Sequence, residues 1–282
     1  MADMAPQPTA KWGDLGVRVV SAAVLIPAVI LDVWVGGIWF NLLIALLAVL
    51  MAQEWTVICH RQSAAQFALH AAAAMCGALL PLEAGITGAL AAIAVLWALS
   101  AALSYAENPQ GAKWQYLGVP YVSLPAMALV ILRSDPDYGA LAILWVMVTV
   151  WSADTLAYFS GRLIGGPKLA PVLSPKKTWA GLGGAIAGSA LAAAIFAAVA
   201  GLPDLLALAL LAGVLAVVEQ AGDLFKSAIK RHHGVKDSGR LIPGHGGIID
   251  RVDGLVAVAT AAALIGALRS GLEATGAGLL LW

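Results

Sequence analysis

The chain has 282 residues, of which 61% are hydrophobic and 11% are charged, with a mean hydropathy of +0.88 and a formal net charge of zero. So little polar surface cannot cover a water-soluble globule of this length, which excludes an ordinary soluble domain. The composition therefore predicts an integral membrane protein.

Apolar runs along the chain predict the membrane-spanning segments. A bilayer core about 30 Å thick needs about 20 apolar residues per helix. Nine stretches meet this need: Val17–Val35, Ile38–Ile58, Ala65–Leu80, Ala84–Tyr105, Trp114–Leu132, Gly139–Phe159, Trp179–Val199, Leu202–Asp223 and Ile249–Leu268. The alternating segments of an outer-membrane barrel are absent from the sequence, and backbone hydrogen bonding in lipid then favours helices. We expect an all-α, polytopic helical bundle with about nine transmembrane helices.

The first stretch is interpreted as a retained helix, because its apolar run exceeds that of a cleaved signal and contains Pro27 and Asp32. We expect two parts: residues 1–138 with spans 1–5, and residues 139–282 with spans 6–9 and two polar loops.

The basic residues predict the orientation, since short basic loops stay on the cytoplasmic side. With nine spans, 14 of the 16 lysines and arginines fall on the face of the N-terminus, and Arg133 and Arg269 fall on the other. The larger set is Lys11, Arg18, Arg61, Lys113, Arg162, Lys168, Lys176, Lys177, Lys226, Lys230, Arg231, Lys236, Arg240 and Arg251. Both polar loops are therefore expected on the cytoplasmic face, with the N-terminus inside.

The loop after the sixth span contains "SPKKTWAG", Ser174 to Gly181, at the start of the next span. It could be an ordinary positive-inside loop with turn residues. Its place at a helix N-terminus favours a phosphate-binding loop with donors from Ser174, Lys176, Lys177 and Thr178. Just beyond it, "GAIAG", Gly184 to Gly188, could pack helices closely within a subunit or between subunits.

Four carboxylates lie at the ends of the last two spans, where an ionised group needs a partner. Glu219 and Asp223 are four residues apart, and Asp250 and Asp253 are three apart, so each pair lies on one helical face. They could simply pair with nearby bases: Lys226, Lys230, Arg231, Lys236 and Arg240. Alternatively, they could bind a divalent cation that bridges a polyphosphate, and we favour this second interpretation.

Glycines between these spans predict an anion-binding turn. "PGHGG", Pro243 to Gly247, can expose backbone N–H groups at a helix N-terminus. His245 could donate to a phosphate or act as a base, and we assign it no proton transfer.

The stretch from Ser227 to Asp253, "SAIKRHHGVKDSGRLIPGHGGIIDRVD", resembles the signature of the phosphatidate cytidylyltransferases, also called CDP-diacylglycerol synthases. The matching positions are Ser227, Lys230, Arg231, Lys236, Asp237, His245, Gly246, Gly247, Asp250, Arg251 and Asp253, and "SPKKTWAG" resembles a second motif of that family. The resemblance covers about Ser152 to Asp253.

The resemblance implies transfer of cytidylyl from CTP to phosphatidate, giving CDP-diacylglycerol and pyrophosphate. It also implies Mg²⁺, with a second cation left open, and a homodimer. Membrane lipid and the two substrates are then the partners, with no nucleic acid. The expected location is a bacterial-type inner membrane, with the site facing the cytoplasm.

We assign roles to the candidate residues as follows. Asp223, Asp250, Lys230 and Arg251 are the catalytic candidates. The substrate-binding candidates are Ser174, Lys176, Lys177, Thr178, Ser227, Arg231, Lys236, Asp237, His245, Gly246 and Gly247. The candidate metal ligands are Asp223 and Asp250 first, with Asp253 and Glu219 in addition.

Two other classes stay open. A CTP-dependent lipid-alcohol kinase would share metal, nucleotide and membrane, and would release CDP rather than pyrophosphate. A secondary transporter would place charges near the bilayer midplane in two similar halves. Here the charges gather at one edge, and no inverted repeat is visible in the sequence, which disfavours transport.

Overall fold

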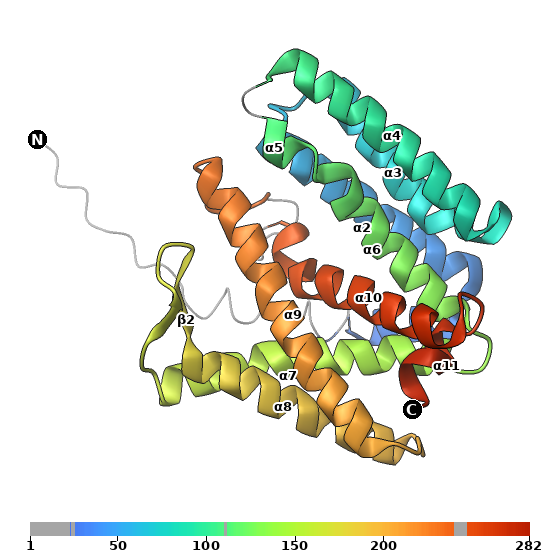
Figure 1. Ribbon diagram of the computed structural model, residues 1–282, viewed down its shortest axis with the longest axis vertical. Coiled ribbons are helices and arrows are strands. Elements are labelled where there is room, and N and C mark those ends of the chain that lie inside the picture. The colour runs from blue at the N-terminus through green and yellow to red at the C-terminus, as the bar shows by residue number, and fades with distance from the viewer. Residues whose placement is uncertain (1–22, 24–25, 110–111, 240–246) are drawn as a thin grey trace, which may run out of the picture.

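A computed structural model describes residue 23 and residues 26–109, 112–239 and 247–282, and the statements below concern those residues. They form a bundle of helices with one small hairpin (Figure 1). The helices are α2 (Gly37–Cys59), α3 (Ala64–Glu83), α4 (Gly85–Glu107), α5 (Ala112–Gln115), α6 (Gly118–Ser134), α7 (Gly139–Leu163), α8 (Trp179–Val199), α9 (Leu205–His232), α10 (Ile249–Ser270) and α11 (Thr275–Leu280). The strands are β1 (Lys168–Ala170) and β2 (Ser174–Thr178).

Eight of these segments are long and apolar enough to cross a membrane, and a shorter apolar helix covers Ile26–Val35. They coincide with the second to ninth predicted stretches, so the prediction of a polytopic helical membrane bundle is confirmed. Of the first predicted stretch, Val17–Val35, residues 17–22, 24 and 25 lie outside the described residues.

Two local features were not predicted from the sequence. The eighth span does not end at Asp223, because α9 continues to His232 through residues that favour helix. Ser227, Lys230 and Arg231 therefore lie on a helix rather than in a loop. The loop after the sixth span contains an antiparallel hairpin, in which Lys168 pairs with Thr178 and Ala170 with Ser174.

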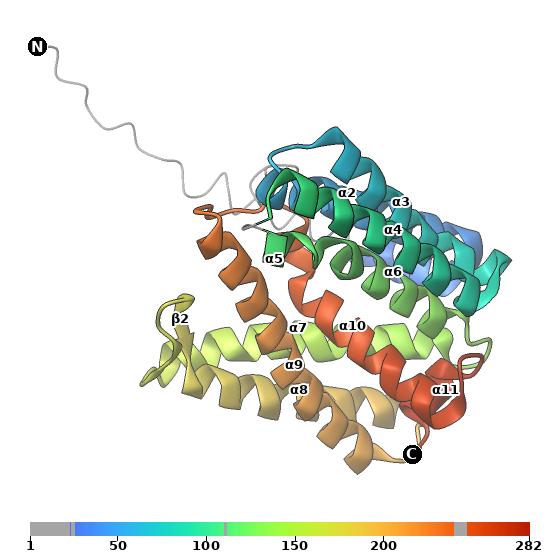
Figure 2. The same ribbon diagram turned by 45° about the horizontal axis from the view of Figure 1, so that its top comes forward.

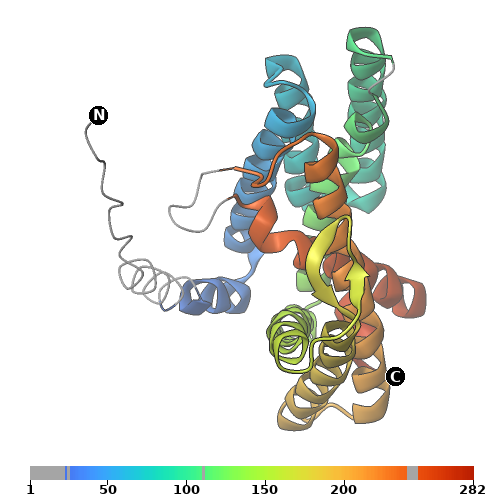
Figure 3. The same cartoon turned by 90° about the vertical axis from the view of Figure 1, so that its left-hand side faces the viewer.

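The long helices form two groups. The axes of α2, α3, α4 and α6 run roughly side by side, while α7 and α8 pack against each other beneath them with the hairpin at one end (Figures 1 and 2). Seen from the hairpin side, α7 runs almost along the line of sight, whereas α2, α3 and α4 stand upright (Figure 3). Between the groups lies α10, which packs against α9, α6 and α7. The charged ends of α9 and α10 thus meet close to the hairpin and to α2.

Glycines let α7 and α8 approach closely. A methyl group added at Gly184 would lie 1.9 Å from Ser160 Oγ and 2.8 Å from the backbone oxygen of Leu156, both on α7. At Gly188 it would lie 2.0 Å from Leu156 Cδ1. The predicted small-residue motif therefore packs within the subunit, against α7.

This packing predicts different outcomes at two adjacent glycines. Gly184→Ala should lower the thermal unfolding midpoint in detergent, because overpacking costs about 1–3 kcal/mol. Gly183→Ala is the control, since a methyl there meets no atom within 4 Å. It should leave the midpoint unchanged or raise it, as removing a helix glycine gains about 0.5–1 kcal/mol. Equal midpoints for the two variants would contradict the proposed α7–α8 contact.

Candidate active site

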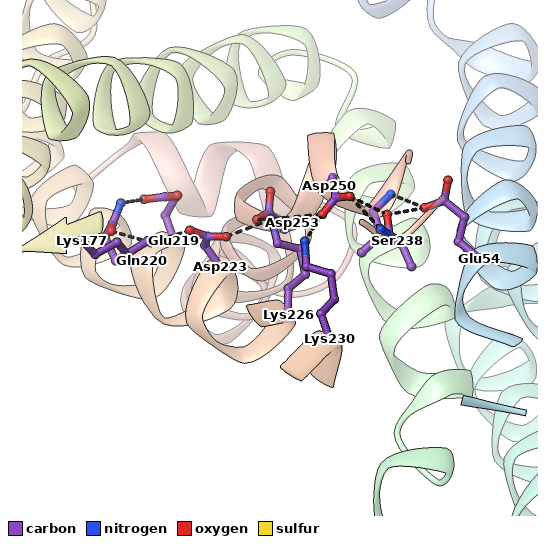
Figure 4. A network of polar contacts seen from close by, with 11 residues as sticks. Glu54, Lys177, Glu219, Gln220, Asp223, Lys226, Lys230, Ser238, Asp250 and Asp253 are labelled. Carbon is purple, nitrogen blue, oxygen red and sulfur yellow. Dashed lines mark hydrogen bonds and ion pairs between the residues drawn. The ribbon is translucent and has the colours of Figure 1, made fainter. Parts of the chain in front are cut away.

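The ammonium group of Lys226 lies among three carboxylates at the meeting point of α9 and α10 (Figure 4). Its Nζ lies 2.9 Å from Asp223 Oδ1 and 3.7 Å from Asp250 Oδ1, and it donates to Asp253 Oδ2. Helical spacing builds the group, because Asp223 precedes Lys226 by three residues on α9 and the other two acids share the first turns of α10.

Two further lysines complete the charge balance. Lys177 Nζ, on β2, lies 2.7 Å from Asp223 Oδ2 and donates to Gln220 Oε1 at 2.7 Å. Lys230 Nζ, on α9, lies 2.5 Å from Asp250 Oδ1. The side chains in these pairs are 10–26% exposed. Since isolated charges at such depth are costly, three lysines offsetting three aspartates explain how the group is tolerated.

The structure therefore shows the ion pairs that were one of the two interpretations of these acids. Glu219 does not join them. It is 1% exposed, accepts from Gln220 Nε2 at 2.6 Å, and contacts the carboxyl group of Asp154 on α7. Asp154 was visible in the sequence as an acid within an apolar span, but it received no role. Two carboxyl groups in contact need a proton or a cation between them.

At the other end of the cluster, Ser238 bridges Asp250 to a residue that the sequence analysis missed. Its backbone N–H donates to Asp250 Oδ2 at 2.8 Å, and its hydroxyl lies 3.0 Å from that oxygen and 2.9 Å from Glu54 Oε2. Glu54 belongs to α2 and is 3% exposed. The available signal was a lone carboxylate in the stretch Ile38–Ile58, because an acid buried in an apolar helix needs partners.

A basic cavity of about 240 Å³ lies beside this cluster. Seven predicted residues line it, from β2, from α9 and from the segment that follows α9. They are Ser174, Lys176, Ser227, Lys230, Arg231, Lys236 and Asp237. The cavity offers several cationic donors within a small volume, which suits a polyphosphate.

A second cavity, of about 360 Å³, lies between α7, α8, β2 and α9. Its ionisable lining residues are Asp154, Arg162, Lys176, Lys177 and Asp223, and the side chains of Ala157, Tyr158 and Leu182 contribute apolar surface. Lys176 lines both cavities. Basic side chains thus line both cavities, and the second cavity also borders apolar side chains of α7 and α8.

Other predicted residues have different surroundings. Thr178 is buried and caps α8, since its hydroxyl accepts from the N–H of Gly181 at 3.0 Å. Arg251 is exposed in the first turn of α10. Gly247 lies against Ser238 and Glu54. His245 and Gly246 lie outside the described residues. The roles assigned to all of these residues stay predictions.

The carboxylates can also be tested for magnesium. Within the described ranges, no group of three or more His, Cys, Asp or Glu side chains is arranged to hold a metal ion. However, three carboxylates converge on the ammonium group of Lys226, which shows that this position favours a positive charge. Their hard oxygens suit Mg²⁺, which commonly takes one or two protein carboxylates and completes its shell with water and substrate phosphates. The donor chemistry therefore fits magnesium without a complete protein cage.

Apolar helices, a balanced acid–lysine cluster and an adjoining basic cavity together define a membrane-embedded protein that handles phosphate-bearing substrates. The sequence model described as "Cytidylyltransferase family" matches residues 16–268. The chain belongs to the cytidylyltransferase family.

Two of three named relatives match most of the chain, and the third matches half of it. It is 41% identical over 261 residues to the phosphatidate cytidylyltransferase of Brucella abortus biovar 1 (strain 9-941), covering 90% of this chain and 94% of the relative. It is 38% identical over 251 residues to that of Pseudomonas aeruginosa, covering 85% and 92%. The Bacillus subtilis (strain 168) protein of the same name is 42% identical over 143 residues, covering 50% and 53%.

The cluster predicts that Lys226 is required for stability. Lys226→Met should lower the free energy of unfolding by about 3–5 kcal/mol, because it leaves buried carboxylates uncompensated. Adding Asp253→Asn should restore part of that loss by removing one negative charge. Lys113→Met, at an exposed position on α5, is the control and should leave the thermal midpoint in detergent unchanged. A Lys226→Met protein as stable as the control would contradict this account of the cluster.

Proposed function

We propose that this chain transfers the cytidylyl group of CTP to phosphatidate, producing CDP-diacylglycerol and pyrophosphate for phospholipid synthesis. Membership of the cytidylyltransferase family and the full-length relatives named phosphatidate cytidylyltransferase support this reaction. The single structural observation that carries it is the pair of adjoining cavities joined by Lys176, one strongly basic and the other partly apolar. Two phosphate-bearing substrates of different polarity can meet there.

The reaction is a displacement at phosphorus. An oxygen of the phosphatidate phosphate attacks the α-phosphorus of CTP, and the bond from that phosphorus to the oxygen bridging to the β-phosphate breaks as pyrophosphate leaves. The nucleophile is already an anion, so no side chain needs to remove a proton. Two anions must instead be brought together, which makes positioning and charge stabilisation the main tasks of the protein.

We assign the two substrates to separate cavities. The triphosphate of CTP binds in the basic cavity, where Lys230, Arg231 and Lys236 offer donors and Ser227 adds a hydroxyl. The phosphate of phosphatidate binds beside Arg162 and Lys177 in the second cavity, whose apolar lining suits the adjoining lipid. Lys176 lines both cavities and lies where the phosphate of phosphatidate would meet the α-phosphate of CTP.

Magnesium completes this proposal. When bound, it would offset phosphate charge and polarise the phosphorus under attack. Asp223 and Asp250 are the proposed ligands, with Asp253 and Glu219 as further candidates, and a second cation stays open. Each of the three aspartates forms an ion pair with a lysine, and Lys230, the partner of Asp250, lines the basic cavity.

The location and assembly of the protein are further proposals. The basic-residue asymmetry supports an inner-membrane protein whose site faces the cytoplasm, where CTP is available. Phosphatidate would then enter from the inner leaflet. A homodimer stays an implication of the family resemblance.

The first functional prediction concerns product and metal. Purified protein given phosphatidate, γ-labelled CTP and Mg²⁺ should form CDP-lipid and labelled pyrophosphate, and chelation should stop the reaction until Mg²⁺ is returned. Labelled lipid phosphate with released CDP would instead identify a lipid-alcohol kinase.

Asp223→Asn and Asp250→Asn should each lower kcat by roughly 100-fold or more, since each removes a charge from the proposed magnesium site. Full activity in either variant would exclude that aspartate as a required ligand.

The second concerns the two cavities. Arg231→Ala should raise the KM for CTP by about tenfold or more and change the KM for phosphatidate little, because a charge-assisted hydrogen bond contributes about 1.5–3 kcal/mol. Arg162→Ala should show the opposite selectivity. Lys168→Ala is the control, since Lys168 lies exposed on the same hairpin and lines neither cavity. If each arginine variant affects both substrates equally, the assignment of separate cavities is wrong.

A further inference from the structure

The carboxylate of Glu54 connects α2 to two chain segments that lie far away in the sequence. Its Oε1 accepts from the backbone N–H of Ile248 at 2.7 Å, and its Oε2 accepts from the N–H of Ile249 at 2.9 Å and from the hydroxyl of Ser238 at 2.9 Å. These partners are 184 to 195 residues away. Because Glu54 is 3% exposed, these three hydrogen bonds take the place of those that water would otherwise make to its carboxylate.

One consequence is a helix cap supplied from another helix. The N-cap residue of α10, Ile248, makes no side-chain capping hydrogen bond. The first N–H groups of a helix have no partner within it, and a negative charge at that end also interacts favourably with the helix dipole. Glu54 meets both needs, and it thereby fixes where α10 begins relative to α2.

The two glycines beside Glu54 make this approach possible. A methyl group at Gly239 would lie 2.6 Å from Glu54 Oε1, and one at Gly247 would lie 2.4 Å from Oε2. A side chain at either position would displace the carboxylate. Two chain segments therefore pack against the carboxylate of Glu54. One contains Ser238 and Gly239, and the other runs from Gly247 to Ile249.

Ser238 transmits this restraint to the acid–lysine cluster. Its hydroxyl has one hydrogen and lies between Glu54 Oε2 and Asp250 Oδ2, while its N–H donates to the same oxygen of Asp250. Asp250 Oδ1 in turn accepts from Lys230, which lines the basic cavity. Figure 4 shows this line of contacts from Glu54 through Ser238 to Asp250.

We propose that Glu54 is a positioning residue for the nucleotide side of the site: through Ser238 and the first turn of α10 it orients Asp250 and Lys230 toward the triphosphate of CTP. This inference rests on the proposed function. Glu54 itself lines a cavity of about 500 Å³ together with Lys236 and Asp237, and those two residues also line the basic cavity. Among the described residues, Glu54 makes no direct hydrogen bond to Arg162 or Lys177, and it is linked to Lys177 only through Ser238, Asp250, Lys226 and Asp223. We therefore expect its effect on CTP binding to exceed its effect on phosphatidate binding.

The kinetic test compares Glu54→Gln, Ser238→Ala and the double variant. An amide offers one acceptor oxygen, so Glu54→Gln leaves at least one of the three donors without a partner. The KM for CTP should rise about tenfold, while the KM for phosphatidate stays within about twofold. Ser238→Ala should raise the KM for CTP in the same selective way, and the double variant should be no worse than Glu54→Gln, because both changes break one connection.

The control is Glu83→Gln, the same chemical change at an exposed position near the end of α3, and it should leave both KM values unchanged. Equal rises in both KM values, unchanged KM values, or multiplicative effects in the double variant would each overturn the proposal. If Glu54→Gln does not fold, Ser238→Ala decides: an unchanged KM for CTP in that variant rejects the positioning role.

A readout independent of activity separates this inference from the proposed function. Amide hydrogen exchange should accelerate at least about tenfold at one or both of Ile248 and Ile249 in Glu54→Gln and stay unchanged in Glu83→Gln, since only the former removes an acceptor from these N–H groups. Wild-type protein that forms no CDP-lipid would reject the proposed reaction, while this exchange result would still test the contact. Unaltered exchange in Glu54→Gln would reject the contact, and with it the inference, even if the enzyme forms CDP-lipid.

Discussion

The cost of burying charge inside an apolar bundle is the constraint on which the rest of the structure depends. Asp223, Asp250 and Asp253 are mostly removed from water, and each is offset by a lysine at ion-pair distance. Lys226 contacts all three, so it fixes α9 against α10 at one point. Lys177 extends the same compensation to β2, which ties the hairpin to α9. The positions of three separate elements thus follow from one requirement for charge balance.

That requirement also extends into the N-terminal helices. Asp250 shares Ser238 with Glu54 on α2, so the polar contacts run from Lys177 on the hairpin, through α9 and α10, to α2 (Figure 4). The division of the chain into residues 1–138 and 139–282 stays a prediction. The contacts of the candidate site nevertheless cross that position, because Glu54 caps the helix that bears Asp250 and Asp253.

The length of apolar runs made the membrane helices predictable, since lipid fixes both the number of residues and the helical backbone. Spacing of three residues also placed Asp250 and Asp253 together correctly. The hairpin was missed because its strands have only three and five residues, too short for an alternating pattern, and its glycines and prolines resemble an ordinary loop. The role of Glu54 could not be read from local pattern, since its partners are set by how α2 packs in three dimensions. The same limit explains why the sequence grouped Glu219 with Asp223, whereas the fold directs it to Gln220 and Asp154.

The length of α9 explains how charged residues can serve a membrane-bound substrate. Its 28 residues extend about 42 Å at 1.5 Å per residue, whereas the hydrocarbon core is about 30 Å thick. Its last turns can therefore stand beyond the core, and they carry Lys226, Lys230 and Arg231 on the same continuous helix as the apolar span. A rigid helix keeps these cations at a fixed height relative to the bilayer, which a flexible loop would not do. For a reaction between a lipid that cannot leave the membrane and a nucleotide that cannot enter it, a fixed height at the boundary is what brings the two phosphates within reach.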